Sequence, residues 1–198
     1  MFGDADLVFD GPVDSLLMSG QILIEEMVFS DRIDWEDWLL ELSEESPLGT
    51  SVSDEEPLFQ FDLDIESRNT VRMRNNVADL LAGGERRVVG DTTRPGLVGS
   101  IRAQPGGRVY LKEREFEVQR GEVLFVEPYT FNPQLDIVLM TDVRARDQEY
   151  DVVYRVGGTY EDWRAETISD PPLPQADVNA LLLFGMTRDE LERYGGLS

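Results

Sequence analysis

The sequence predicts a mostly β protein, built as a curled antiparallel meander of short strands with one apolar face and short helices at its C-terminus. Alternation of apolar and polar residues with a period of two recurs along the chain, which is typical of half-buried strands. Glycines, prolines or charged pairs separate the alternating segments. Helical patterns are confined to two short regions, residues 31–42 and 174–196.

Residues 1–42 are expected to form short strands and a short amphipathic helix that belong to the same sheet as the rest of the chain. The alternation at Ile22 and Ile24 indicates one of these strands, and residues 31–42 change to a helical period. Residues 43–57 are rich in Ser, Glu, Pro and Gly and almost lack apolar side chains. We therefore expect an acidic flexible insertion there.

Residues 58–198 are expected to form the main β domain, which opens with the most regular strand of the chain. Its apolar residues occupy every second position, namely Phe59, Phe61, Leu63 and Ile65. The segments 77–81 and 87–89 are then predicted to form a hairpin around a turn at Gly83-Gly84. A strand containing Ile101 follows.

Residues 106–137 hold the clearest series of short strands. We expect reversals at Gly106-Gly107, Glu113-Arg114 and Gly121, because glycine accepts a positive φ, and a further turn at Asn132-Pro133. Apolar residues of the intervening strands share one parity and so indicate one apolar face. These residues are Val109, Leu111, Phe116, Val118, Val123, Phe125, Leu135, Ile137 and Leu139.

Two longer strands and two helices are predicted to complete the chain. Val152 and Tyr154 share the apolar face of one strand, and Gly157-Gly158 is expected to turn the chain into the next. Pro174 suits the first turn of a helix that stops at Gly185. A capping-box spacing at residues 187–190 predicts a second short helix. We expect these helices to cover one end of the sheet and its last edge.

Composition excludes several classes of function. The net charge of −22 opposes binding to a nucleic-acid backbone, and the acidic excess lies in residues 1–67, where Arg32 is the one base. The absence of Cys and His excludes Cys/His zinc sites and triads that depend on imidazole. Carboxylate pairs such as Asp62 and Asp64 lie on the polar side of a strand, where solvated charge is the expected role. We expect no enzymatic activity and no cofactor.

No apolar run is long enough for a transmembrane helix, and the N-terminus does not have the pattern of a signal peptide. If the protein works outside the cytoplasm, the chain is expected to be a fragment of a longer protein.

The predicted sheet has too few helices to cover its apolar face. Such a sheet packs on another sheet, closes into a barrel, or curls into an open trough. A trough would present apolar surface to a ligand or a partner. Each acyl CH₂ buried there would contribute about 0.8 kcal/mol.

Two segments, Gly96 to Ile137 and Arg155 to Gly185, resemble the C-terminal conserved region of the TamB family, a subunit of the bacterial translocation and assembly module. The shared features are a Gly-led strand, a Gly-rich turn, a hairpin, an Asn-Pro-x-Leu-Asp turn and a Ser-x-Pro-x-Leu motif before a Leu-rich helix that ends in Gly. They correspond to residues 99–107, 114–125, 132–136 and 169–185. The acidic residues 43–57 are not part of that pattern.

The resemblance implies a β-taco, which is a curled, mostly antiparallel sheet with an apolar inner surface. It also implies a non-enzymatic role in outer-membrane biogenesis, in the periplasm and associated with the outer membrane, with a parent protein anchored in the inner membrane. The implied partners are an Omp85-type outer-membrane barrel (TamA-like) and either phospholipid or unfolded outer-membrane protein. An alternative is a structural docking module that binds the barrel without carrying lipid.

On this hypothesis a groove would shield phospholipid acyl chains or nascent outer-membrane β-strands. The candidate groove-lining residues are Phe59, Phe61, Leu63, Ile65, Ile101, Val109, Phe116, Val118, Leu135, Ile137, Leu139, Val152 and Tyr154. The candidate partner-docking residues are Leu181, Leu182 and Phe184. Charged substitutions at Phe61 and Ile137 are expected to abolish lipid photocrosslinking without unfolding the protein.

Overall fold

The computed structural model describes residues 2–12, 16–32, 59–111, 114–145 and 148–184. Within these ranges the chain forms ten strands and one helix, α2 (Gln175–Phe184). The strands are β1 (Phe2–Asp10), β2 (Leu16–Phe29), β3 (Phe59–Arg74), β4 (Ala78–Asp91), β5 (Pro95–Ala103), β6 (Arg108–Leu111), β7 (Arg114–Phe125), β8 (Gln134–Ala145), β9 (Gln148–Thr159) and β10 (Trp163–Asp170).

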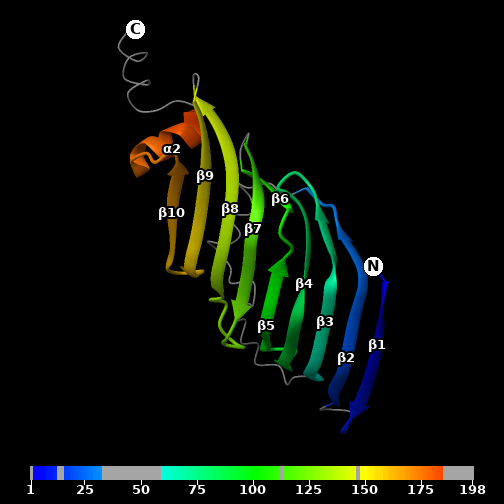
Figure 1. Cartoon of the computed structure of the whole chain (residues 1–198). Coiled ribbons are helices and arrows are strands. Elements are labelled where there is room, and N and C mark those ends of the chain that lie inside the picture. Colours follow the sequence, from blue (N-terminus) through cyan, green and yellow to red (C-terminus); the bar gives the residue numbers. More distant parts are fainter. Residues whose placement is uncertain (1, 13–15, 33–58, 112–113, 146–147, 185–198) are drawn as a thin grey trace.

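All of the described strands belong to one sheet in the order β1-β2-β3-β4-β5-β7-β8-β9-β10, with β6 paired to β4 and β7. Figure 1 shows them as a single layer, with α2 against the end formed by β9 and β10. The predicted fold class, mostly β and mainly antiparallel with a terminal helix, is confirmed.

One pairing departs from the antiparallel meander, because β2 and β3 are parallel. Parallel neighbours need a crossover of a dozen or more residues, and the long connection between Phe29 and Phe59 provides one. The helix expected at residues 31–42 and the acidic segment 43–57 both belong to this connection. Residues 33–58 lie outside the described residues, so these two predictions are not tested. The short helix expected after Thr187 also lies outside them.

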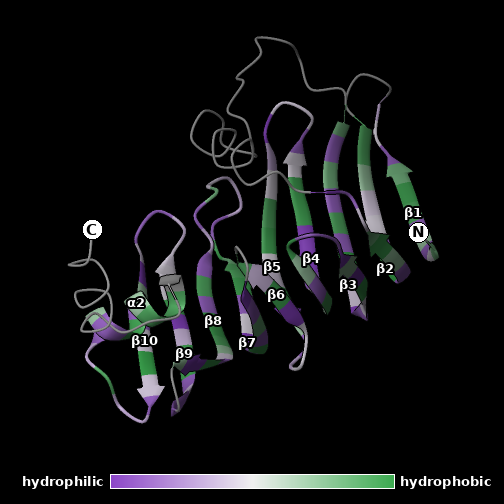
Figure 2. Ribbon diagram, turned by 90° about the horizontal axis from the view of Figure 1, so that it is seen from above, coloured by the Kyte–Doolittle hydropathy of each residue, from purple (hydrophilic) through white to green (hydrophobic). Residues whose placement is uncertain are grey.

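Strand register gathers the apolar residues on one side of the sheet, here called the apolar face. Residues directly opposite each other on paired strands share a face. Leu63 lies opposite Val88, Val118 opposite Leu139, and Leu139 opposite Tyr154. The other side, here called the charged face, carries the intervening polar residues. Figure 2 shows the resulting alternation of hydrophobic and hydrophilic segments along the strands.

Three of the predicted glycine turns are wrong. Gly83-Gly84 lies inside β4, Gly121 inside β7 and Gly157-Gly158 inside β9, while the chain reverses after Thr159. At Gly84 an added Cβ would stand 2.0 Å from the backbone oxygen of Ser100. Glycine is needed there for close approach of the strands rather than for a turn.

The expected reversal at Gly106-Gly107 is also wrong. Both β5 and β6 pair antiparallel with β4 and with β7, so they run in the same direction, as two segments of one interrupted strand. Residues 104–107 form a bulge between them, held by hydrogen bonds from the Gln104 N–H to the Leu81 oxygen and from the Gly106 N–H to the Val118 oxygen, both 2.8 Å.

Helix α2 covers one end of the apolar face. It begins directly after Pro174, as the sequence predicts, and β10 ends at Asp170 before a cis Asp170-Pro171 bond. Its buried residues pack on the end of β8 and the beginning of β9, in a cluster of Val143, Ala145, Val152, Val178 and Leu181. A second cluster, Phe116, Val118 and Leu139, lies beside it, and Leu182 contacts both. The core is therefore concentrated at the C-terminal half of the sheet.

Candidate ligand-binding groove

A cavity of about 410 Å³ opens on the apolar face beyond the part that α2 covers. Every lining residue is apolar or glycine except Glu122, which register places opposite Arg102 on the charged face. The lining comes from strands β2 to β8 and consists of Met27, Phe29, Val71, Met73, Leu80, Ala82, Ile101, Ala103, Val109, Val118, Gly121, Glu122, Val123, Ile137 and Leu139. We call this cavity the groove.

Irregularities in β2 and β3 preserve the apolar parity of the groove. The register of β3 against β4 shifts between Ser67 and Val71. Ser67 lies opposite Gly84 before the shift, Val71 lies opposite Ala82 after it, and both residues are on the apolar face. Asn69 accommodates this shift with a φ of 55°. The bulge thus lets the strand continue with Val71 and Met73 still facing the groove.

The structure divides the thirteen predicted groove residues into three sets. All of them lie on the apolar face by register. Five line the groove itself: Ile101, Val109, Val118, Ile137 and Leu139. Val152 is fully buried under α2, and Phe116 is 4% exposed beside Tyr154, their ring centroids 6.4 Å apart. The others, Phe59, Phe61, Leu63, Ile65 and Leu135, extend along the same face outside the groove.

Several groove residues are missing from the sequence-based selection. The ten that it lacks are Met27, Phe29, Val71, Met73, Leu80, Ala82, Ala103, Gly121, Glu122 and Val123. Leu80 and Ala82 could have been predicted from the sequence, because they lie two positions apart on one face of the segment before Gly84. The positions of Met27 and Phe29 in the groove could not, because they depend on the parallel pairing of β2 with β3.

The candidate docking residues lie on α2. Leu181 is fully buried against Val178 and the sheet, and Leu182 packs between the two core clusters. With α2 seated in this way, the side chain of Leu181 is not available to a partner. Phe184 ends the helix.

One charged side chain, Arg86, lies on the apolar face. Arg86 pairs with Ile65 on β3 and with Gly99 on β5. Its Nη2 donates to Ser67 Oγ at 2.5 Å and to the Gly84 oxygen at 3.4 Å. Its Nε is buried and has no hydrogen-bond partner among the described residues. Desolvation lowers the pKa of Arg86 below its ordinary value. Sequence reasoning missed it because the segment was interpreted as one arm of a hairpin.

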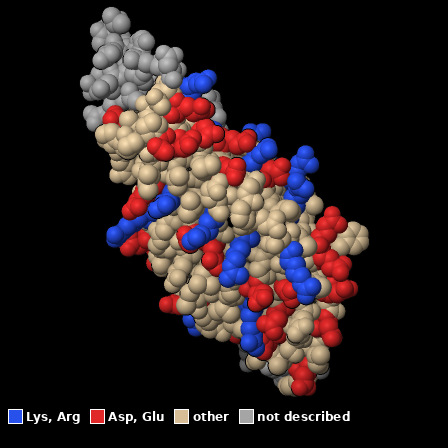
Figure 3. Space-filling model, in the orientation of Figure 1, with Lys and Arg blue, Asp and Glu red and all other residues tan. Residues whose placement is uncertain are grey.

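The charged face carries cross-strand ion pairs. Arg87 Nε lies 2.6 Å from Asp62 Oδ1, and Arg102 Nε lies 2.8 Å from Glu122 Oε1. Figure 3 shows basic and acidic side chains side by side over the middle strands and acidic side chains gathered over the β1–β2 end. Hydrogen bonding from Arg87 is the main cause of a lowered pKa at Asp62.

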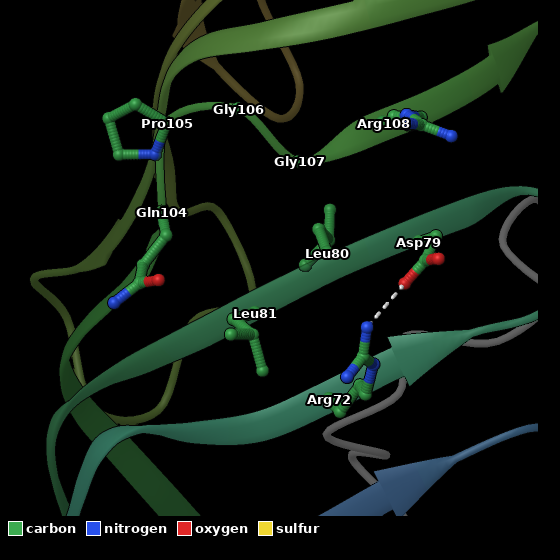
Figure 4. A pocket seen from close by; sticks show the side chains of 9 residues that line it. All are labelled: Arg72, Asp79, Leu80, Leu81, Gln104, Pro105, Gly106, Gly107 and Arg108. Atoms are coloured by element: carbon green, nitrogen blue, oxygen red, sulfur yellow. Dashed lines mark hydrogen bonds and ion pairs between the residues drawn. The ribbon is translucent and has the colours of Figure 1, made fainter.

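A smaller cavity of about 290 Å³ surrounds the β5–β6 bulge and is shown in Figure 4. Arg72 Nη2 and Asp79 Oδ1 approach to 3.4 Å across it. The second arginine in its lining, Arg108, is engaged with Glu115 at 3.2 Å. This cavity therefore holds satisfied surface charges around a backbone bulge, and it is a weaker candidate for ligand binding than the groove.

Neither a metal site nor a membrane-spanning helix is found in the described part of the chain. No three His, Cys, Asp or Glu residues there are grouped so that they would hold a metal ion. No helix among the described residues has the length and apolar character needed to cross a bilayer.

The fold and the groove place the chain in the class of open, single-layer β-sheet proteins with an apolar face. The TamB C-terminal domain model matches residues 2–198, which include β1, β2 and the acidic segment. The chain belongs to the TamB family. Membership assigns it to the translocation and assembly module of outer-membrane biogenesis, a cell-envelope role, and the family is an assembly component rather than a class of enzymes.

Proposed function

We propose that the groove shields the acyl chains of phospholipids as they pass between the inner and outer membranes. The observation that carries the proposal is the groove itself, about 410 Å³ in volume, with a nearly all-apolar lining on a face that α2 covers at one end only. Soluble proteins rarely leave such a surface without an occupant. In this role the domain works in the periplasm, close to an Omp85-type barrel of the outer membrane, and its parent protein is anchored in the inner membrane.

The energetics suit a carrier. Burial of one acyl CH₂ contributes about 0.8 kcal/mol, so a few methylenes offset the several kcal/mol lost in association. The groove offers apolar contact with few directional hydrogen bonds, which allows a chain to slide along the face. Nascent outer-membrane β-strands, with apolar residues at alternate positions, are a second cargo that the same surface would accept.

Fluorescent-lipid binding to the purified domain tests this function. Ile101→Asp and Ile137→Asp each place a charge in the groove, and both are expected to abolish binding because a buried unpaired carboxylate is costly. Val138→Asp is the matched control, since Val138 adjoins Ile137 but lies opposite Arg155 on the charged face. Circular dichroism checks the fold of each variant. Equal binding by all four proteins would overturn the proposal.

A docking role is the second candidate, favoured by the free edge of β1. In the described part of the chain β1 pairs with β2 alone, and Phe2, Val8 and Phe9 are 72%, 56% and 54% exposed. An exposed edge accepts a further strand by β-augmentation. On this candidate function the edge would bind the Omp85-type barrel without any lipid being carried.

Proline substitution distinguishes docking from lipid binding. Adjacent N–H groups of a strand point to opposite edges, and proline has no N–H. One of the two variants Leu7→Pro and Val8→Pro therefore removes an N–H donor that points to the free edge of β1. Docking through this edge predicts that one of the two variants loses binding to the purified barrel partner while lipid binding is retained. Retention of barrel binding by both would exclude the edge.

A further inference from the structure

The guanidinium of Arg86 is partly buried on the apolar face and has no counterion within the described ranges. Among the described residues no carboxylate lies within 4.0 Å of it, whereas six other arginines form such ion pairs. These are Arg68, Arg72, Arg87, Arg102, Arg108 and Arg120. A partly buried cation without a counterion is an unfavourable arrangement that an anionic ligand would relieve.

The hydrogen bonds of Arg86 leave donors available. Both of its hydrogen bonds come from Nη2, and Nε is buried without an acceptor. A guanidinium has five N–H donors in a planar fork, which suits two oxygens of one phosphate. Nη1 makes no hydrogen bond in the described part of the chain, so its donors are available to a phosphate oxygen.

Two positions beside Arg86 on the apolar face carry no side chain. Gly84 precedes Arg86 by two positions on β4, and Gly99 lies directly opposite it on β5. Neither position accepts a side chain, because an added Cβ would stand 2.0 Å from the Ser100 oxygen at Gly84 and 2.2 Å from the Glu85 oxygen at Gly99. The close approach of β4 and β5 therefore requires glycine at both positions, and neither contributes a side chain next to Arg86.

We propose that Arg86 anchors the phosphate of a phospholipid whose acyl chains lie in the groove. Ile101, which lines the groove, is two positions beyond Gly99 on β5, a separation of about 7 Å along a strand. Ala82, on β4, is four positions from Arg86, or about 13 Å. The apolar lining of the groove thus begins about one glycerol length from the guanidinium. A phospholipid with its phosphate at Arg86 would therefore have its acyl chains in the groove. This inference rests on the proposed lipid-binding function and adds the recognition of the head group.

A pair of adjacent arginines provides the experiment. Arg86→Met removes the cation from the apolar face, and Arg87→Met removes the same charge from the charged face, where Arg87 pairs with Asp62. Arg86→Met removes the buried Nε donor that has no partner together with the two hydrogen bonds from Nη2, so circular dichroism and urea denaturation check the fold of each variant. Each protein is titrated with fluorescent phosphatidylglycerol and with a fluorescent diacylglycerol that has the same acyl chains and no phosphate.

Wild type and Arg87→Met are expected to bind phosphatidylglycerol about tenfold more tightly than diacylglycerol, as one charge-assisted contact allows. Arg86→Met should bind the two lipids equally, and Arg86→Lys should keep part of the preference. An unchanged preference in Arg86→Met, or no preference in wild type, would refute the anchor and leave the groove intact. A wild type that binds neither lipid refutes the lipid-binding function and the anchor with it. A fatty acid that competes as well as phosphatidylglycerol would show that any anion suffices, which contradicts recognition of a phosphate.

Discussion

Arg114 on β7 donates a hydrogen bond from its Nη2 to the backbone oxygen of Leu181 on α2 at 2.8 Å, and its Nε donates to the oxygen of Leu182. These carbonyls belong to the last turns of the helix, whose final carbonyls have no intrahelical partners and carry partial negative charge. The last turn of α2 has no basic residue of its own. Arg114 therefore supplies the cation that holds α2 on the apolar face.

Removal of this cation should weaken the attachment of α2. Arg114→Met is expected to lower the free energy of unfolding by about 1.5–3 kcal/mol, the range for hydrogen bonds to charged groups. Arg120→Met, on the same strand, removes only an exposed pair with Asp136 and should cost less than about 1 kcal/mol. Urea denaturation measures both, and equal losses in the two variants would contradict the role of Arg114.

The seat of α2 depends on Leu181. Leu181 is fully buried against Val143, Val152 and Val178, so Leu181→Ala should destabilise the protein by about 2–5 kcal/mol. Ile168→Ala, at a position 48% exposed on β10, is the control and should cost less than about 1 kcal/mol. Thermal and urea unfolding test the difference. A Leu181→Ala protein of wild-type stability would show that α2 does not pack on the sheet as described.

Two strand glycines should respond differently to substitution. Gly84 has a φ of +147° and the Ser100 oxygen in the path of a Cβ, so Gly84→Ala should cost more than about 1 kcal/mol. Gly157 lies in β9 with its nearest neighbour 3.9 Å from an added Cβ, so Gly157→Ala should be close to neutral. The order of the two unfolding midpoints is the measurement, and the reverse order would refute the close approach of β4 and β5.

The Asp62–Arg87 pair should appear in the pH dependence of stability. Hydrogen bonding from Arg87 lowers the pKa of Asp62 from its ordinary 3.8, so the folded state favours the ionised form. The pair's contribution to stability is therefore complete above pH 3.8 and is lost as the pH falls through the lower folded-state pKa. An NMR titration of the Asp62 carboxyl should show this low pKa and its rise toward 3.8 in Arg87→Met. An identical titration in both proteins would contradict the pairing.

The sequence predicts well what depends on local alternation. The shared face of Val118, Ile137 and Leu139 follows from the period of two, and register carries that parity from strand to strand. The C-terminal helix follows from Pro174 and the apolar run behind it.

Features that depend on neighbouring strands were not predictable in this way. A glycine pair such as Gly83-Gly84 has the pattern of a turn, and only the approach of β5 shows that it lies within a strand. The parallel pairing of β2 and β3, which brings Met27 to the groove, follows a long crossover that local alternation does not reveal. Arg86 was missed for a related reason, since its place on the apolar face requires β4 to be one continuous strand.

Site-specific photocrosslinking on β8 tests the central claim most directly. Adjacent residues Ile137 and Val138 lie on opposite faces of the same strand, Ile137 in the groove and Val138 opposite Arg155. A photoreactive amino acid at each position, in the full-length protein within its native envelope, should crosslink phospholipid at Ile137 and not at Val138. Equal crosslinking at the two positions, or none at Ile137, would contradict a lipid-binding apolar face.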